Sequence, residues 1–397
     1  MQAFPTVRFR ALPVSENLPT ILTGAAPHVH GMWGPCLRSD RRPGVFQRSV
    51  DCLPDLVTTT AQCVAHAISG PIEVATMPPR RRRRFDWMRM NIKFARDKSQ
   101  VVRRINKTPS IFNVLGSQGE FVYEDRHEQL DTLLDAAVAD DREFRMIANH
   151  SLDYLLHWNM GDGSVGTYET KTDAFIAELE TKCRQSGIDF MLLSDHGQDA
   201  VTRVVDIVKE VDTLDLDQDQ VDIFVENTRA TLWWQDEATG ARLLEHLDQL
   251  DFVSVLLADD LARFGVHFPD GRYGQAYVFA DPGCTFFPND FFQPFANFVL
   301  SQKDPGMRTR RNRPWHVGDH GYLAETTTEY GFMTLAADGY RALSETIHLT
   351  DIAPSILTLL ERQPPESMTG RAVFARRSHA PTPRSHAATP RSAEIVE

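Results

Sequence analysis

Hydrophobic and polar positions alternate in blocks from residue 143 onward, and the blocks are of two lengths. Short apolar runs, of the length of strands, occupy residues 144–148, 188–193, 222–225, 230–234, 275–280 and 331–336. Longer stretches with apolar residues at helical spacing occupy residues 165–186, 238–249 and 350–361. Strands that alternate with amphipathic helices predict an α/β fold. Polar groups at the carboxyl ends of such strands are expected to gather at one edge of the sheet.

The first 125 residues and the C-terminus are less regular. Residues 1–35 predict a loop and then a short helix, which begins near Pro19 and stops at Gly24. Residues 40–125 show no clean periodicity and are interpreted as an insertion or cap region. Residues 376–397 repeat Pro, Ser, Arg, His and Ala, which cannot bury apolar area, so they predict a disordered tail.

Composition is that of a soluble globular protein. The 397 residues are 42% hydrophobic and 24% charged, and 42 Lys and Arg against 54 Asp and Glu give a formal net charge of −12. That balance creates no general attraction for nucleic acid or an anionic membrane, and no duplex binding is expected. No apolar run approaches the roughly 18 residues that span a bilayer. The five cysteines are scattered, without a C-x-x-C pair, which favours a reducing, cytoplasmic location.

Three short Asp/His clusters carry the candidate chemistry. They are Asp153-x-x-x-His157, Asp195-His196 and Asp319-His320, of which the last two precede glycine. Carboxylate and imidazole are the usual zinc ligands outside thiolate sites. On a helix, a spacing of four places Asp153 and His157 on one face, although the same spacing also makes an ordinary surface pair. Asp195-His196 ends a buried strand, where unpaired polar groups are costly. Together the clusters predict a divalent-metal site.

With these clusters in view, the chain resembles the alkaline phosphatase superfamily and, within it, the type I phosphodiesterase/nucleotide pyrophosphatase family. The resemblance spans residues 11–375, with 40–125 poorly matched. It is carried by residues 18–24 (Leu-Pro-Thr-Ile-Leu-Thr-Gly), Pro27, His30-Gly31, Asp153-x-x-x-His157, 192–197 (Leu-Leu-Ser-Asp-His-Gly), 318–322 (Gly-Asp-His-Gly-Tyr) and 349–355 (Leu-Thr-Asp-Ile-Ala-Pro-Ser). It implies one hydrolase domain over residues 1–375, a three-layer α/β sandwich whose central, mostly parallel sheet has helices on both faces.

The resemblance also implies two divalent metal ions, usually zinc, at the carboxyl edge of the sheet. By position, Asp153, His157 and His320 would hold one ion. Asp195 and His196 would hold the other, together with a nucleophilic hydroxyl.

Ser15 is the expected nucleophile. Thr20 and Thr23 are alternatives, but their hydroxyls are expected to be hydrogen-bonded locally within the helix or turn. Asn17 is expected to donate to a phosphoryl oxygen, or else to cap the helix that follows.

One ligand of the second metal has no counterpart in this sequence. In the resembling family a further Asp comes from a strand well before the nucleophile, whereas this chain starts fourteen residues before Ser15. We therefore expect an N-terminal truncation or a weakened second site.

The implied function is hydrolysis of phosphodiester or nucleotide pyrophosphate bonds in a small phosphorylated substrate, through a covalent phosphoserine. Two alternatives stay open. One is a sulfatase or phosphomutase on the same scaffold, although residues 15–19 (Ser-Glu-Asn-Leu-Pro) lack the C/S-x-P-x-R context of sulfatases. The other is an inactive homologue that binds metal and phosphorylated ligands or a partner chain.

Overall fold

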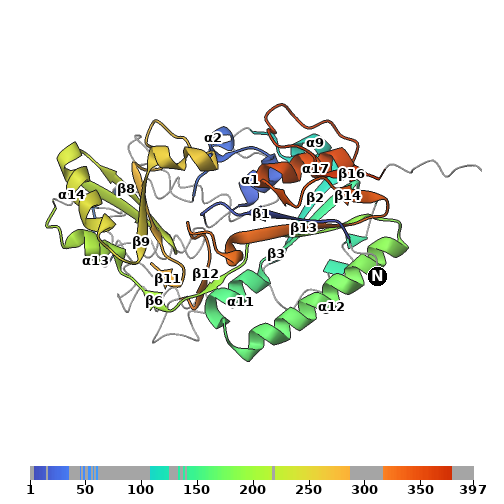
Figure 1. Ribbon diagram of the computed structural model, residues 1–397, viewed down its shortest axis with the longest axis horizontal. Helices are drawn as coiled ribbons and strands as arrows, with labels where there is room; N and C mark the ends of the chain where they lie inside the picture. Colours follow the sequence, from blue (N-terminus) through green and yellow to red (C-terminus); the bar gives the residue numbers. More distant parts are fainter. Residues whose placement is uncertain are drawn as a thin grey trace, which may run out of the picture.

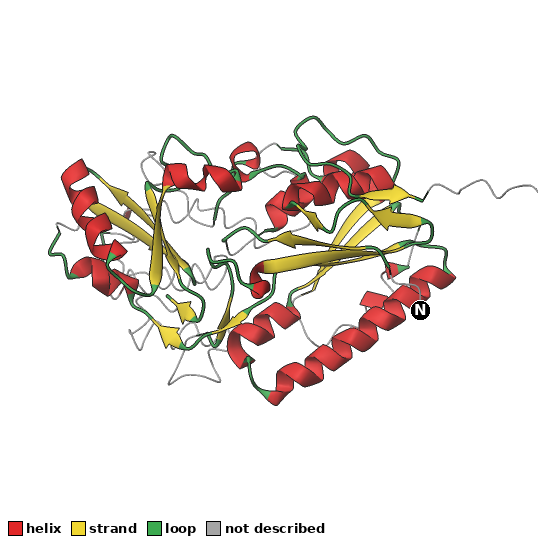
Figure 2. Ribbon diagram, in the orientation of Figure 1, coloured by secondary structure: helices red, strands yellow, loops and turns green. Residues whose placement is uncertain are grey.

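The structure is a computed structural model that describes residues 4–14, 17–34, 108–124, 141–216, 220–286 and 316–377, with short pieces between residues 45 and 60 and between 133 and 138. Ser15, most of the expected insertion 40–125 and the expected tail from residue 378 onward lie outside the described residues. The described strands fall into two main groups, which lie side by side (Figure 2).

The first main sheet joins strands from both ends of the chain in the order β15-β1-β13-β4. Its strands are β1 (Thr6–Arg10), β4 (Phe190–Ser194), β13 (Tyr330–Ala336) and β15 (Thr346–Ile347). β13 runs antiparallel to both β1 and β4, while β1 and β15 are parallel. The prediction of a loop was wrong for β1. Val7 and Phe9 are buried while Thr6 and Arg8 are exposed, which is the period-two pattern of a half-buried strand.

A parallel pair, β2 (Gly119–Glu124) and β3 (Phe144–Asn149), packs on the same core. Phe121 of β2 belongs to the buried cluster that contains Val7 and Phe9, and Met146 of β3 packs against it. The preceding helix α9 (Ile111–Leu115) adds three buried side chains to this core. Residues 108–124 therefore form part of the central core, although their sequence pattern placed them in the poorly matched region.

Helices cover both faces of these strands (Figure 1). On one face lie α1 (Leu18–Thr23), α9 and α17 (Ile352–Leu359), and on the other α11 (Ser151–Asn159) and α12 (Gly163–Gln185). The three layers confirm the predicted α/β class. At the end of α1, Gly24 adopts φ 55°, and a Cβ there would lie 2.8 Å from Cδ of Pro354 in α17. Glycine therefore lets α1 end against α17.

The second main sheet has the order β7-β8-β10-β9 and is entirely antiparallel. Its strands are β7 (Val221–Val225), β8 (Arg229–Trp234), β9 (Val253–Leu257) and β10 (Ala276–Ala280). The helices α13 (Ile207–Asp212) and α14 (Glu237–Asp248) pack on it around a second apolar core. The first main sheet, which was expected to be mostly parallel, is mixed, with two antiparallel pairings and one parallel pairing. The second main sheet is antiparallel because short turns such as the one between β7 and β8 permit only antiparallel pairing.

The remaining described elements are short. They are α2 (Pro27–His30), η1 (Gly116–Gln118), β5 (Asp199–Ala200), β6 (Arg203–Val204), η2 (Ala258–Phe264), β11 (Cys284–Thr285), β12 (Gly318–Asp319), η3 (Thr327–Glu329), β14 (Tyr340–Ala342), η4 (Leu349–Asp351) and β16 (Phe374–Arg376). None of the described helices combines the length and the apolar character needed to cross a membrane.

Candidate metal centre

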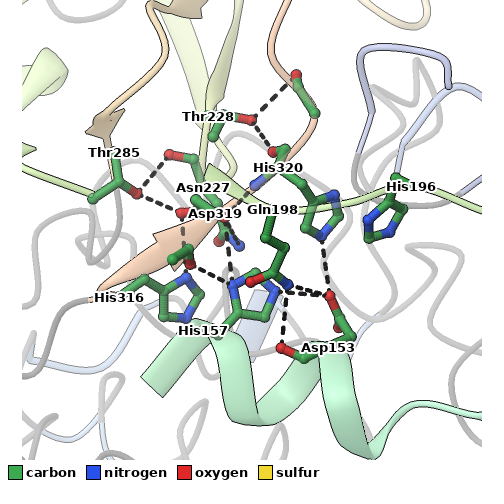
Figure 3. A network of polar contacts seen from close by, with 12 residues as sticks. Asp153, His157, His196, Gln198, Asn227, Thr228, Thr285, His316, Asp319 and His320 are labelled. Atoms are coloured by element: carbon green, nitrogen blue, oxygen red, sulfur yellow. Dashed lines mark hydrogen bonds and ion pairs between the residues drawn. The ribbon is translucent and has the colours of Figure 1, made fainter. Parts of the chain in front are cut away.

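Three segments far apart in the sequence bring the expected ligands together (Figure 3). α11 begins directly after β3 and carries Asp153 and His157 one turn apart, as the spacing predicts. Asp195 follows the last residue of β4. β12 pairs with β5, which lies just beyond the Asp195 turn, and this pairing carries His320 to α11. The site therefore lies where β3, β4 and β12 end.

The first cluster, which consists of Asp153, His157 and His320, has the spacing of a metal site. Oδ1 of Asp153 lies 3.5 Å from Nε2 of His157 and 3.6 Å from Nε2 of His320. Charge-assisted hydrogen bonds are shorter, about 2.8 Å. Zinc bonds of roughly 2.05 Å in a tetrahedron place neighbouring ligand atoms about 3.4 Å apart. Both distances from Asp153 therefore match the separation of two ligands of one cation, and one ligand atom of each of the three residues lies within 4.8 Å of the others.

Backbone carbonyl groups determine which imidazole nitrogen faces that space. Nδ1 of His157 lies 2.9 Å from the carbonyl oxygen of Gly318. A carbonyl only accepts, so Nδ1 carries the proton and Nε2 presents its lone pair toward Asp153. A Cβ at Gly318 would lie 2.6 Å from the carbonyl oxygen of Leu156, so glycine allows this close approach to α11. Nδ1 of His196 bonds the Gly197 carbonyl in the same way, at 2.9 Å.

The charge states of the first cluster suit a cation. Burial would raise the pKa of Asp153, but the nearby histidines, first His157 and then His320, lower it below its usual range. Burial and the neighbouring His196 hold the pKa of His320 well below its ordinary value, so its imidazole is neutral at pH 7. A metal ligand has to be an ionised carboxylate or a neutral imidazole. One carboxylate and two imidazoles thus form a donor set that fits zinc.

The second cluster, Asp195 and His196, is less complete. Oδ2 of Asp195 lies 3.5 Å from Nε2 of His196, and the His196 ring stacks on His320 with centroids 3.7 Å apart. Burial lowers the pKa of His196, but the carboxylates of Asp195 and Asp153 raise it above its ordinary value. Among the described residues, neither group of three potential metal ligands includes Asp195 or His196. β1, the strand ahead of Ser15, has the sequence Thr-Val-Arg-Phe-Arg and supplies no carboxylate.

Three polar residues near the expected nucleophile are described, and they differ in whether their hydrogen bonds are the expected ones. Asn17 does not cap α1 with its side chain. Its Oδ1 accepts from the backbone N–H of Leu12 at 2.9 Å, and its Nδ2 is buried with no hydrogen-bond partner among the described residues. Thr23 donates to the carbonyl of Pro19 at 2.7 Å, as expected. The prediction of a local bond was wrong for Thr20, whose hydroxyl lies 3.0 Å from Nε2 of His30.

Two contacts of the centre were missed by the sequence reasoning. The amide of Gln198 donates to Oδ1 of Asp153 at 2.5 Å, and its Oε1 is buried without a partner in the described part of the chain. His316 and Asp319 form a second buried group with His157. The only sequence signals are that Gln198 directly follows the Asp-His-Gly turn and that His316 lies near His320. Neither signal reveals a contact, because both contacts depend on where β12 meets α11.

The fold and the donor set define an alkaline-phosphatase-like α/β protein with a candidate metal centre. The family model for type I phosphodiesterase / nucleotide pyrophosphatase matches residues 4–323, and the chain belongs to this family of hydrolases. No curated protein matches the chain.

Solved structures of similar fold include murine ectonucleotide pyrophosphatase/phosphodiesterase 5, at TM-score 0.54 and 12% identity, covering 91% of this chain and 88% of that one. An inactive variant of the same murine protein in complex with AMP gives TM-score 0.54 and 12% identity, covering 91% and 87%. The human protein aligns at TM-score 0.44 and 14% identity over only 59% of each chain. At these identities the likeness shows the fold alone.

Proposed function

We propose that the chain is a metal-dependent hydrolase of phosphate esters, acting on phosphodiester or nucleotide pyrophosphate bonds of a small phosphorylated substrate. Family membership supports this class of reaction. The observation that carries the proposal is the convergence of Asp153, His157 and His320, whose ligand atoms lie 3.5 and 3.6 Å apart. The AMP complex of the murine relative is consistent with a nucleotide-like substrate.

We propose two zinc ions as the cofactor. Asp153, His157 and His320 would hold the first ion, while Asp195 and His196 would hold the second with the hydroxyl of Ser15. When bound, such a pair supplies stabilisation of the attacking and leaving oxygens in an in-line displacement.

The proposed reaction has two displacements at phosphorus. Oγ of Ser15 forms a bond to phosphorus, loses its proton, and the bond from phosphorus to the leaving oxygen breaks. The leaving alcohol or nucleotide departs with a proton. Water then attacks the phosphoserine, which releases the phosphate monoester and restores the hydroxyl. Asn17 supports this assignment, because its buried, unpartnered Nδ2 would gain a bond by donating to a phosphoryl oxygen.

The direct test is hydrolysis of bis(4-nitrophenyl) phosphate by protein purified without chelator. We expect release of nitrophenol that stops with a chelator and returns with added zinc. Activity that resists the chelator would overturn the proposal. 4-Nitrophenyl sulfate is the matched comparison, since faster turnover of the sulfate ester would favour the sulfatase alternative.

A second candidate function is binding of a phosphorylated ligand without turnover. It is favoured by one observation, that no third ligand joins Asp195 and His196 among the described residues. Zinc per chain, measured by plasma mass spectrometry, separates the two. About two ions per chain would support the hydrolase, while one ion with nucleotide binding but no hydrolysis would support the binding protein.

We also propose a cytoplasmic location. Among the described cysteines, Cys52, Cys183 and Cys284 are free thiols, which suits a reducing compartment. Fractionation of cells that express the full-length protein tests this proposal.

A further inference from the structure

A second buried group lies behind His157, on the side away from Asp153 (Figure 3). Its members are His157, His316 and Asp319, with one ligand atom from each inside 4.8 Å of the others. Because His157 belongs to both groups, the second group has two physical interpretations. It would be either a cation site of its own or a support for the imidazole of His157.

The carboxylate of Asp319 is already occupied by protein donors. Its Oδ2 accepts from the Thr285 hydroxyl at 2.7 Å and lies 3.3 Å from Nδ1 of His316. Its Oδ1 accepts from Nδ2 of Asn227 and from the backbone N–H of His320, both at 3.3 Å. Each carboxylate oxygen accepts about two hydrogen bonds, so neither has a lone pair left for a cation.

The carboxylate of Asp319 is fully buried beside the imidazole of His157. Its Oδ1 lies 3.6 Å from Nδ1 of His157. It favours the tautomer with the proton on Nδ1, which already donates to the Gly318 carbonyl at 2.9 Å. That proton prevents a cation from binding at Nδ1 and makes Nε2 a more basic ligand.

His316 holds the ring of His157 by packing. The two imidazole rings have centroids 4.4 Å apart and planes inclined by 33°. On its other side, His316 meets the edge of the buried Trp158 ring at 4.8 Å. The ring of His157 is thus confined on one face, while its Nδ1 is bonded.

We infer that Asp319, with His316, is a positioning residue pair that orients His157 for the first metal site and is not a separate cation site. This inference rests on the proposed function. The donors that hold Asp319 come from two other elements: Asn227 from the turn before β8 of the second main sheet, and Thr285 from β11, which pairs with β6. The strength of zinc binding at Asp153 and His157 then depends on residues that never touch the ion.

The test is the zinc affinity of the full-length protein and its Asp319→Asn variant, measured by competition with a chromogenic chelator. Asparagine keeps the shape and some of the bonds but removes the charge. We expect binding weaker by about 10- to 100-fold with the number of zinc ions per chain unchanged. Loss of one ion per chain would instead identify the group as a cation site and overturn the inference. Unchanged affinity would overturn it as well.

Asp351→Asn is the matched control. Asp351 is also a buried carboxylate, and it accepts the backbone N–H groups of His348 and Arg371, each at 2.9 Å, outside the metal centre. We expect this variant to lose stability but to bind zinc as the parent does. An equal loss of affinity in both variants would show a merely structural role for Asp319.

His316→Phe keeps the inference testable if Asp319→Asn does not fold. Phenylalanine retains packing against Trp158 and removes the nitrogen that faces Asp319. We expect affinity weaker by about 3- to 10-fold and an altered visible absorption of the cobalt-loaded protein, since the ligand field reports the orientation of His157. Parent-like affinity and spectrum would overturn the inference. If the parent itself binds no zinc, the proposed function fails and the inference fails with it. If the parent binds zinc and the variants bind it equally well, the inference alone fails.

Discussion

The two ligand clusters of the metal centre differ in how firmly the protein holds them. Asp153 and His157 lie on one helical turn, and each has a buried partner, Gln198 for the carboxylate and the Gly318 carbonyl for the imidazole. Asp195 and His196 lie in a turn after β4. The Asp195 side chain is 43% exposed, against 35% for Asp153. Within the described residues, the imidazole of His196 hydrogen-bonds to the carbonyl of its sequence neighbour Gly197.

This difference separates a preorganised site from an adaptable one. Ligands that are already oriented lose little freedom when a cation binds, so the first cluster is expected to bind more tightly. The second cluster is expected to depend on Ser15 and on the substrate to complete its coordination. Three experiments test this difference between the clusters, and a fourth tests the stability of the fold in acid.

The largest effect is expected from removing a ligand of the first cluster. His157→Ala should lower kcat/KM on bis(4-nitrophenyl) phosphate by at least about 1000-fold, because several kcal/mol of charge stabilisation are lost. Zinc per chain should fall at the same time. Near-parent activity would mean that the first cluster is not part of the catalytic centre.

Ser15→Ala should also reduce turnover on the order of 1000-fold, because no covalent intermediate can form. In contrast to the previous variant, tight zinc binding at the first cluster should persist. Trapping of a phosphoenzyme, followed by peptide mass spectrometry, checks the assignment. A phosphate found on Thr20 or Thr23 would identify that threonine, and not Ser15, as the nucleophile.

Asp195→Asn tests zinc binding at the second cluster. Stepwise removal of zinc with a chelator should show two phases in the parent, a weak and a tight one. We expect the variant to lose the weak phase and to keep the tight phase within about 3-fold, because Gln198 and the Gly318 carbonyl still orient Asp153 and His157. Loss of both phases would show that the stacked rings of His196 and His320 couple the two clusters strongly.

The smallest effect is expected on the stability of the fold at acidic pH, through the buried His30 near α1. Burial, and then the charge of His28, lower the pKa of His30 to about 3. Its unfolded-state pKa is about 6.5, so the neutral form stabilises the fold above that pH. This stabilisation is lost as the pH falls from about 6.5 toward 3. In urea titrations without metal, His30→Gln should flatten the pH dependence of the unfolding free energy. An unchanged slope would contradict the assignment.

Much of the fold was predictable where local patterns are strong. The helix of residues 165–186 appears as α12, and the strand of 331–336 appears as β13. β1 was missed because its five residues form a strand only by pairing with β13 and β15, from the other end of the chain. β2 was missed for the same reason, since its partner is β3.

The candidate site shows the same division. Asp153 and His157 were predictable as a pair because four residues make about one helical turn. Gln198 was not, because its contact with Asp153 joins residues 45 positions apart. The unpaired amide of Asn17 was likewise hidden, since a pattern search sees only its suitability as a helix cap.

The chemistry of the ligands and their local spacing follow from the sequence, because carboxylate and imidazole are properties of single side chains. Which nitrogen of a histidine faces the metal site, and which residues support that histidine, depends on the tertiary structure. The bonds of Asp319 to Asn227 and Thr285 span 92 and 34 residues. Contacts over such distances arise from the packing of whole elements, β12 against α11 and the second main sheet beside both, which no local pattern encodes.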